Sequence, residues 1–117
     1  MKRLLIIEED PDVREMMVFL FENNGYDVIT HGKDLSVADA LSIAPNLIVV
    51  DYQLGDMPGN DLVKKLKSDD KCNPIPIILY SATQSVDKIR VKSLAEGFIG
   101  KPYELDDFVW QVSRMAL

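Results

Sequence analysis

Carboxylates follow two of the most apolar stretches of the chain. Glu8 and Glu9 come directly after residues 4–7, and Asp51 comes directly after residues 47–50. Short apolar runs that end in turn residues are typical of strands buried on both faces, because a strand covered on one face alternates. In open α/β sheets, ligands bind at the edge formed by the carboxyl ends of such strands. These acids are therefore candidates for a functional site, although an aspartate here is also common in an ordinary turn.

Two other polar residues follow apolar stretches later in the chain. Ser81 closes the run 75–80, and Lys101 follows the short run that contains Phe98 and Ile99. If these runs are strands of the same sheet, a hydroxyl and an ammonium group come at the edge that carries the acids.

The spacing of apolar residues predicts the elements that bring these groups together. We predict five strands, at residues 4–7, 26–30, 47–50, 75–80 and 98–99, and five helices that alternate with them. The helices begin after the predicted caps Asp10, Ser36, Asn60 and Ser85 and, for the last one, near Leu105; Asn24-Gly25 and Pro45 end the first two. This alternation, with right-handed crossovers, predicts an α/β protein whose parallel sheet is covered on both faces. The expected architecture is a flavodoxin-like (βα)5 three-layer sandwich with a parallel five-stranded sheet in the order 2-1-3-4-5.

The predicted strand order places the acids of two strands side by side. The first and third strands are neighbours in this order, so Glu8, Glu9 and Asp51 would converge. Crowded carboxylates raise one another's pKa, and desolvation adds to the penalty, so a cation is needed to keep them ionised. Oxygen ligands, with no histidine or cysteine nearby, favour Mg²⁺, which takes phosphate oxygens as further ligands. We therefore predict Mg²⁺ as the cofactor at this edge.

Composition limits the class of the protein and its partners. A chain of 117 residues with 47% hydrophobic residues has the size of one domain with its own core. The net charge of -6 and the pI near 4.6 argue against direct nucleic-acid binding, which needs a basic surface. Lys64, Lys65 and Lys67 recur at helical spacing and are explained as a solvated helix face. The lone Cys72 cannot form an internal disulfide, and nothing resembles a signal peptide or a membrane span, so we expect a cytoplasmic protein.

Four short motifs at the ends of the predicted strands resemble those of one protein family. They are Ile6-Ile7-Glu8-Glu9-Asp10-Pro11, Val50-Asp51 with Gly59 eight residues later, Tyr80-Ser81-Ala82 and Lys101-Pro102-Tyr103. Together they are similar to the ordered signature of the receiver domain of bacterial two-component response regulators, the chemotaxis-receiver-like domain. One motif alone has little specificity, but four in the right order have much more, and they span essentially the whole chain. The resemblance implies a single receiver domain over residues 1–117.

The resemblance implies a phosphoacceptor and a metal site. Asp51 would be the nucleophile that takes a phosphoryl group from a phosphohistidine on a partner histidine kinase or phosphotransfer protein. Glu9, Asp51 and the backbone carbonyl of Gln53 would hold Mg²⁺, and Glu8 would act through a water. The chain would be a phosphoprotein of a phosphorelay. It would not be an enzyme, apart from assisting its own phosphorylation and dephosphorylation.

The resemblance also assigns the groups that bind the phosphoryl oxygens and respond to them. Lys101, the Ser81 hydroxyl and the backbone N–H of Ala82 would bind these oxygens. In the family, the hydroxyl residue moves toward the phosphoryl group, and an aromatic residue three positions before the lysine turns inward. Phe98 occupies that aromatic position, although a plain core phenylalanine explains it equally well.

Two departures from the family pattern leave an alternative open. Glu9 stands where the family usually has an aspartate, and its extra methylene would displace the ion by about an ångström, against the octahedral demand of Mg²⁺. The segment from Ser81 to Lys101 is shorter than in common members by about two residues. The alternative is a pseudo-receiver that keeps the fold and acts as a constitutive protein-docking module. The set of Asp51, Ser81 and Lys101 favours the phosphorylation-dependent switch.

Trp110 is the remaining candidate for a partner contact. Helical spacing predicts a core face of Leu105, Phe108, Val109 and Val112, with Trp110 on the opposite side of the last helix. An exposed tryptophan could dock a downstream protein target, whereas a ring lying flat over its own domain fits the pattern equally well. We expect no direct contact with nucleic acid or membrane, and a monomer or a phosphorylation-dependent homodimer.

Overall fold

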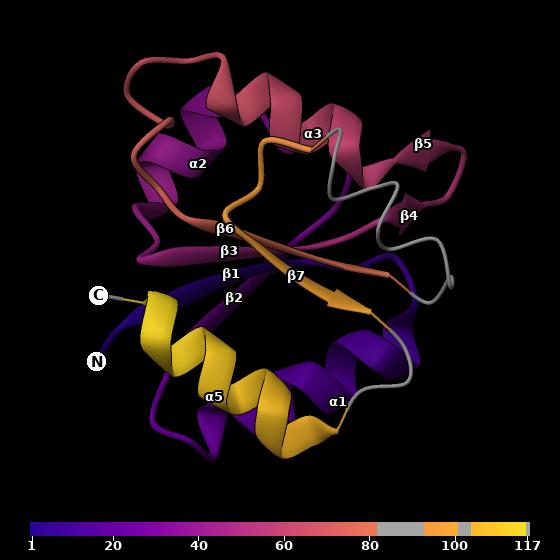
Figure 1. The fold of residues 1–117 in the computed structure, drawn as a ribbon, viewed down its shortest axis with the longest axis vertical. Helices are drawn as coiled ribbons and strands as arrows, with labels where there is room; N and C mark the ends of the chain where they lie inside the picture. Colours follow the sequence, from indigo (N-terminus) through magenta and orange to yellow (C-terminus); the bar gives the residue numbers. More distant parts are fainter. Residues whose placement is uncertain (82–92, 101–103, 117) are drawn as a thin grey trace.

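Five strands form one parallel sheet in the computed structural model, which describes residues 1–81, 93–100 and 104–116 (Figure 1). The strands are β1 (Arg3–Ile7), β2 (Asp27–His31), β3 (Leu47–Asp51), β6 (Ile77–Ser81) and β7 (Gly97–Gly100). Their order in the sheet is β2-β1-β3-β6-β7. Counted along the sheet's own strands, this is the predicted order 2-1-3-4-5, so the predicted flavodoxin-like fold is confirmed.

Helices cover both faces of the sheet. They are α1 (Pro11–Glu22), α2 (Val37–Ile43), α3 (Gly59–Lys67) and α5 (Leu105–Met115). Figure 1 shows α2 and α3 on one side of the sheet and α1 and α5 on the other. The side chains of residues 4–7 and 47–50 are fully buried because each strand packs alternate residues into one of two apolar clusters. This two-sided burial explains why both runs are continuously apolar.

Side-chain caps fix where the first two helices begin. Oδ1 of Asp10 accepts hydrogen bonds from the N–H groups of Asp12 and Val13, at 2.9 and 3.4 Å, and Pro11 is the first helical residue of α1. Ser36 and Asp39 form a reciprocal capping box at the start of α2. The predicted starts of both helices are confirmed.

The segment after β3 differs from the prediction. Residues 55–59 were expected to be loop, but β5 (Met57–Pro58) pairs with β4 (Gln53–Leu54) in a small antiparallel hairpin. The predicted cap Asn60 is also wrong, since α3 begins at Gly59 with Pro58 in the capping position. A Cβ on Gly59 would lie 2.1 Å from the carbonyl oxygen of Asp51. The close approach of α3 to β3 therefore requires glycine at the first helical position.

Two surface predictions are corrected. Lys67 was expected on a solvated helix face with Lys64 and Lys65, but it is buried because its ammonium has partners in a later loop. Leu105 was expected in the core, but 44% of it is exposed because it is the first residue of α5, while Phe108 and Val112 are buried one and two turns further on.

Some predictions fall outside the described residues. Most of the helix expected after Ser85 falls on residues 82–92, as does most of the segment between Ser81 and Lys101 that is shorter than in the family. Leu94 was expected on the same helix, but it is described, lies in no helix and is 56% exposed. Among the helices of the described residues, none is long and apolar enough to span a membrane.

Candidate functional site

The ends of β1 and β3 bring the predicted acids to one edge of the sheet. Ile7 lies opposite Val50 in the parallel register, so Glu8 and Asp51 follow at neighbouring strand ends. We call Glu8, Glu9 and Asp51 together the acidic edge. The sheet order explains why residues more than forty positions apart in the sequence come to this place.

Asp51 is the last residue of β3 and is half-buried. Its Oδ1 accepts a hydrogen bond from the N–H of Gln53 at 3.1 Å. The N–H of Tyr52, the next residue, donates to the carbonyl of Tyr80 on β6 at 2.8 Å, and Gly59 packs against the Asp51 carbonyl. The backbone of Asp51 is thus held by two neighbouring elements, while the residue stays partly accessible to solvent.

Glu8 is buried, with 3% of its surface exposed. Its Oε2 accepts a hydrogen bond from the N–H of Asp10 at 3.1 Å, and its Oε1 accepts one from the hydroxyl of Tyr80. A buried carboxylate requires such donors, because desolvation without them is strongly unfavourable. Glu8 is therefore the buried, hydrogen-bonded member of the acidic edge.

Glu9 is exposed and contacts the loop between β2 and α2. Its Oε1 accepts a hydrogen bond from the N–H of Lys33 at 3.0 Å. With Glu8 and Glu9 engaged by different partners, the described residues contain no cluster of three metal-ligating side chains. The donor set still fits Mg²⁺, since it offers only oxygens, and an exposed Glu9 can turn to the ion by releasing one hydrogen bond. The sequence placed the strand ends together, and the structure adds the partners that the carboxylates have there.

A lysine and an aspartate connect two loops beside the acidic edge. Nζ of Lys33 lies 2.6 Å from Oδ1 of Asp56, in the turn between β4 and β5. The hydrogen bond and charge of Asp56 raise the pKa of the Lys33 ammonium, and the same hydrogen bond lowers the pKa of the Asp56 carboxyl. Both groups therefore stay ionised at neutral pH, and the charge of Glu9 makes a smaller contribution that also raises the pKa of Lys33.

The residues predicted to bind phosphoryl oxygens are only partly described. Ser81 is the last residue of β6 and is 2% exposed. Alternation puts it on the same face of β6 as Leu79, which lies opposite Phe98 of β7. Ser81 and Phe98 therefore share the face that α3 covers. Ala82 and Lys101 lie outside the described residues.

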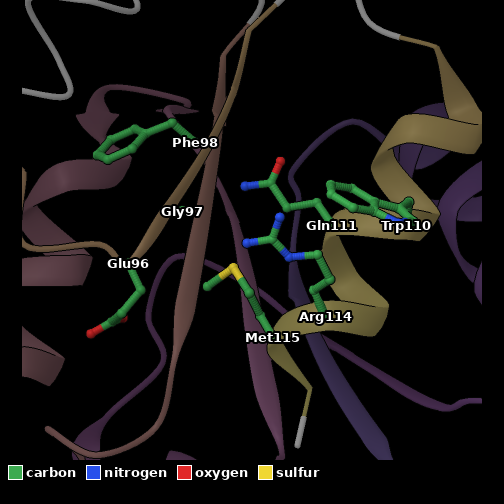
Figure 2. Close-up of a pocket in the computed structure, with 7 residues that line it drawn as sticks. All are labelled: Glu96, Gly97, Phe98, Trp110, Gln111, Arg114 and Met115. Carbon is green, nitrogen blue, oxygen red and sulfur yellow. The ribbon is translucent and has the colours of Figure 1, made fainter.

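A groove lies between the edge strand β7 and α5. It has a volume of about 640 Å³, and Trp110, Gln111 and Arg114 line it from the helix. Trp110 is 58% exposed, as predicted, and the Arg114 guanidinium lies 4.6 Å from the centre of its ring. Figure 2 shows Phe98 on the opposite side of β7 from these helix residues. Phe98 and Trp110 are thus separated by the edge strand.

Three polar residues near the site had no predicted role. The Tyr80 hydroxyl could have been anticipated, because it is the only polar side-chain group in the run 75–80, next to Ser81, and alternation along β6 places its ring on the same face as Ile78. The pair of Lys33 and Asp56 gives no comparable signal, since the two residues lie in separate loops 23 positions apart.

Comparison with known proteins identifies the family. The model of the response regulator receiver domain matches residues 4–113, and the chain belongs to that family. Its members are receiver domains of two-component signalling systems, and Mg²⁺ and an aspartyl phosphate are typical of them. Receiver domains are in general signalling modules rather than enzymes.

The relatives include transcriptional regulators. The chain is 27% identical over 117 residues to the phosphate regulon transcriptional regulatory protein PhoB of Escherichia coli. The aligned region covers 97% of this chain and 51% of PhoB. It is 30% identical over 117 residues to the probable transcriptional regulatory protein TcrX of Mycobacterium tuberculosis, and the aligned region covers 96% of this chain and 48% of TcrX. The chain thus spans about half the length of these relatives.

Solved structures share the fold over nearly the whole chain. The chemotaxis protein CheY4 of Vibrio cholerae superposes with a TM-score of 0.86 at 21% identity, covering 98% of both chains. The non-phosphorylated HemR receiver domain of Leptospira biflexa superposes with a TM-score of 0.80 at 26% identity, covering 99% of this chain and 94% of that one.

Proposed function

We propose that this chain is one receiver domain over residues 1–117 that accepts a phosphoryl group on Asp51 in a phosphorelay. The donor is a phosphohistidine on a partner histidine kinase or phosphotransfer protein. The observation that carries the proposal is the position of Asp51, partly accessible at the end of β3 and beside the buried Glu8 of the neighbouring strand. Membership of the receiver family supports the same chemistry.

The transfer is a displacement at phosphorus. A carboxylate oxygen of Asp51 attacks the phosphorus atom, the P–N bond of the phosphohistidine breaks, and its electron pair returns to the imidazole nitrogen. The main-chain contacts of Tyr52 and Gly59 hold the attacking residue in place. Such positioning is the larger part of catalysis in phosphoryl transfer.

Mg²⁺ is the proposed cofactor. Glu9, Asp51 and the backbone carbonyl of Gln53 would hold it, and Glu8 would bind one of its waters. When bound, the ion neutralises the charge of the carboxylates and of the phosphoryl oxygens. Oε1 of Glu9 would give up its hydrogen bond from the N–H of Lys33 if that oxygen became the ligand.

The switch is proposed to act through Ser81 and Phe98. The Ser81 hydroxyl, the Ala82 N–H and the Lys101 ammonium would bind the phosphoryl oxygens. The common face of Ser81 and Phe98 supports a coupled movement, because a shift of the hydroxyl at the end of β6 changes the space beside β7.

A downstream protein is proposed to dock on α5 at Trp110. Figure 2 shows the carboxylate of Glu96 turned away from Arg114, and Glu96 is paired with Lys67 at 2.7 Å. Among the described residues, Arg114 has no carboxylate partner, so a partner with an acidic residue next to an apolar one fits this groove. We propose a cytoplasmic location, and a monomer or a phosphorylation-dependent homodimer.

Intact mass after incubation with acetyl phosphate and Mg²⁺ tests the proposed function. We expect one phosphoryl adduct in the wild type and none in Asp51→Asn or without metal. An adduct only in Glu9→Asp would place a defect at the metal site. If neither the wild type nor Glu9→Asp forms an adduct, phosphoacceptance is refuted and the chain is a constitutive docking domain.

A further inference from the structure

The side chain of Tyr80 crosses the strand that carries Asp51. We propose that Tyr80 is a positioning residue, whose hydroxyl holds the Glu8 carboxylate ready for a water of the bound Mg²⁺. This inference rests on the metal site of the proposed function and adds a residue to it. The family motif around Ser81 assigns no role to Tyr80, the residue before it.

The sheet order shows how far this contact reaches. Tyr80 lies on β6 and Glu8 follows β1, and β3 runs between these two strands. Neighbouring strands are about 4.8 Å apart, so the two side chains together span about 10 Å. Asp51 lies directly opposite Tyr80 in the register. The Tyr80–Glu8 hydrogen bond therefore passes across the end of β3 at the level of Asp51.

Packing fixes the ring that carries this hydroxyl. Tyr80 is 4% exposed, and its ring lies 5.8 Å from that of Phe108 on α5, at an interplanar angle of 55°. Phe108 in turn packs against Phe21 of α1, with ring centres 5.5 Å apart. The Tyr80 carbonyl also accepts the hydrogen bond from Tyr52. A ring enclosed in this way aims its hydroxyl at one place, which is what a preorganised site requires.

The carboxylate oxygens of Glu8 can each accept one more hydrogen bond, for example from a metal-bound water. Tyr80 donates to Oε1 and Asp10 donates to Oε2, and each carboxylate oxygen can accept a second hydrogen bond. Without the Tyr80 hydroxyl, Oε1 of the buried Glu8 carboxylate loses its donor. The Glu8 side chain then loses one of the two hydrogen bonds that orient it. Loss of a group that orients a metal site typically lowers metal affinity by about 10- to 100-fold.

Calorimetric titration of the unphosphorylated chain with Mg²⁺ tests the inference. We expect Tyr80→Phe to weaken Mg²⁺ binding by about tenfold or more. Tyr26→Phe is the matched control, because it removes the same hydroxyl from a ring at the edge of the same apolar cluster, 6.1 Å from Phe21. Tyr26 precedes β2 at the amino ends of the strands, far from Glu8, so its variant should bind Mg²⁺ like the wild type.

A double variant separates positioning from a general loosening of the core. Once Glu8→Gln has removed the charge that Tyr80 orients, adding Tyr80→Phe should change Mg²⁺ affinity little further. Full additivity of the two changes would overturn the inference, and so would a Tyr80→Phe variant that binds Mg²⁺ as tightly as the wild type or more tightly. A wild type that binds no Mg²⁺ would refute the proposed metal site itself, and with it the role of Tyr80. The two failures are therefore distinguishable.

Discussion

The ammonium of Lys67 connects three segments that lie far apart in the sequence. It donates to the carbonyls of Asn73 and Ile75, at 2.8 and 2.7 Å, and lies 2.7 Å from Oε2 of Glu96. The other oxygen of Glu96 accepts a hydrogen bond from the N–H of Ile77 at 2.9 Å. The end of α3, the loop before β6 and the residue before β7 are thus held by one side chain, which is 3% exposed.

Lys67→Met should destabilise the fold by about 2–4 kcal/mol. Breaking a fully buried ion pair typically has an effect of about 3–5 kcal/mol. The effect is smaller here because the Glu96 side chain is 43% exposed and water can replace its lost partner, whereas the two carbonyls lose a charged donor. Methionine keeps the apolar stem of the lysine, so the difference reports the ammonium. Glu96→Gln should have an effect of about 1–2 kcal/mol, since Lys67 keeps both carbonyls.

Urea unfolding of the wild type, both single variants and the double variant measures these differences. Lys64→Met is the control, because it removes an ammonium from an exposed position of the same helix and should change stability by less than about 0.5 kcal/mol. The two single effects should not add, since both remove the same ion pair. If Lys67→Met is as stable as the control, the ammonium does not hold these segments together and the reasoning is wrong.

Three further predictions concern a close contact, a helix cap and a thiol. Gly59→Ala should lower the free energy of unfolding by about 1–3 kcal/mol or more and slow adduct formation, because its Cβ meets the backbone of Asp51. Gly32→Ala is the control for unfolding alone, because its Cβ would face the movable side chains of Asp34 and Glu9; equal urea midpoints of the two variants would contradict the argument. Hydrogen bonds from Ser36 lower the pKa of Asp39, so the ionised carboxylate stabilises the fold above the ordinary pKa of 3.8 and this stabilisation should be lost as the pH falls below it. The thermal midpoint of Asp39→Asn should therefore fall less on acidification than that of the wild type, and an equal fall in both would refute this prediction. Burial raises the pKa of the Cys72 thiol, so a disulfide reagent at pH 8 should label it only after urea unfolding, and rapid labelling of the folded chain would contradict its burial.

Local features of the sequence were enough to predict most elements. Asp10, Pro11 and Ser36 start helices through contacts within three residues, which short-range spacing reveals. Continuous apolar runs at residues 4–7 and 47–50 predict burial on both faces. The elements that were misjudged depend on long-range packing. The start of α3 depends on the approach of Gly59 to Asp51, and the burial of Lys67 depends on Glu96, 29 residues further on.

The sequence by itself determined which strand ends carry acids and, through the alternation of elements, that Glu8 and Asp51 come to one edge. Only the tertiary structure decided which partner each carboxylate has there. Glu8 is held by Tyr80 across an intervening strand, and Glu9 by the backbone of Lys33 in a loop. Hydrogen bonds between side chains depend on distances of a few tenths of an ångström between distant segments, and sequence periodicity does not encode such distances. Strand order follows from chain pattern, whereas the hydrogen-bond partners follow from how the folded segments pack.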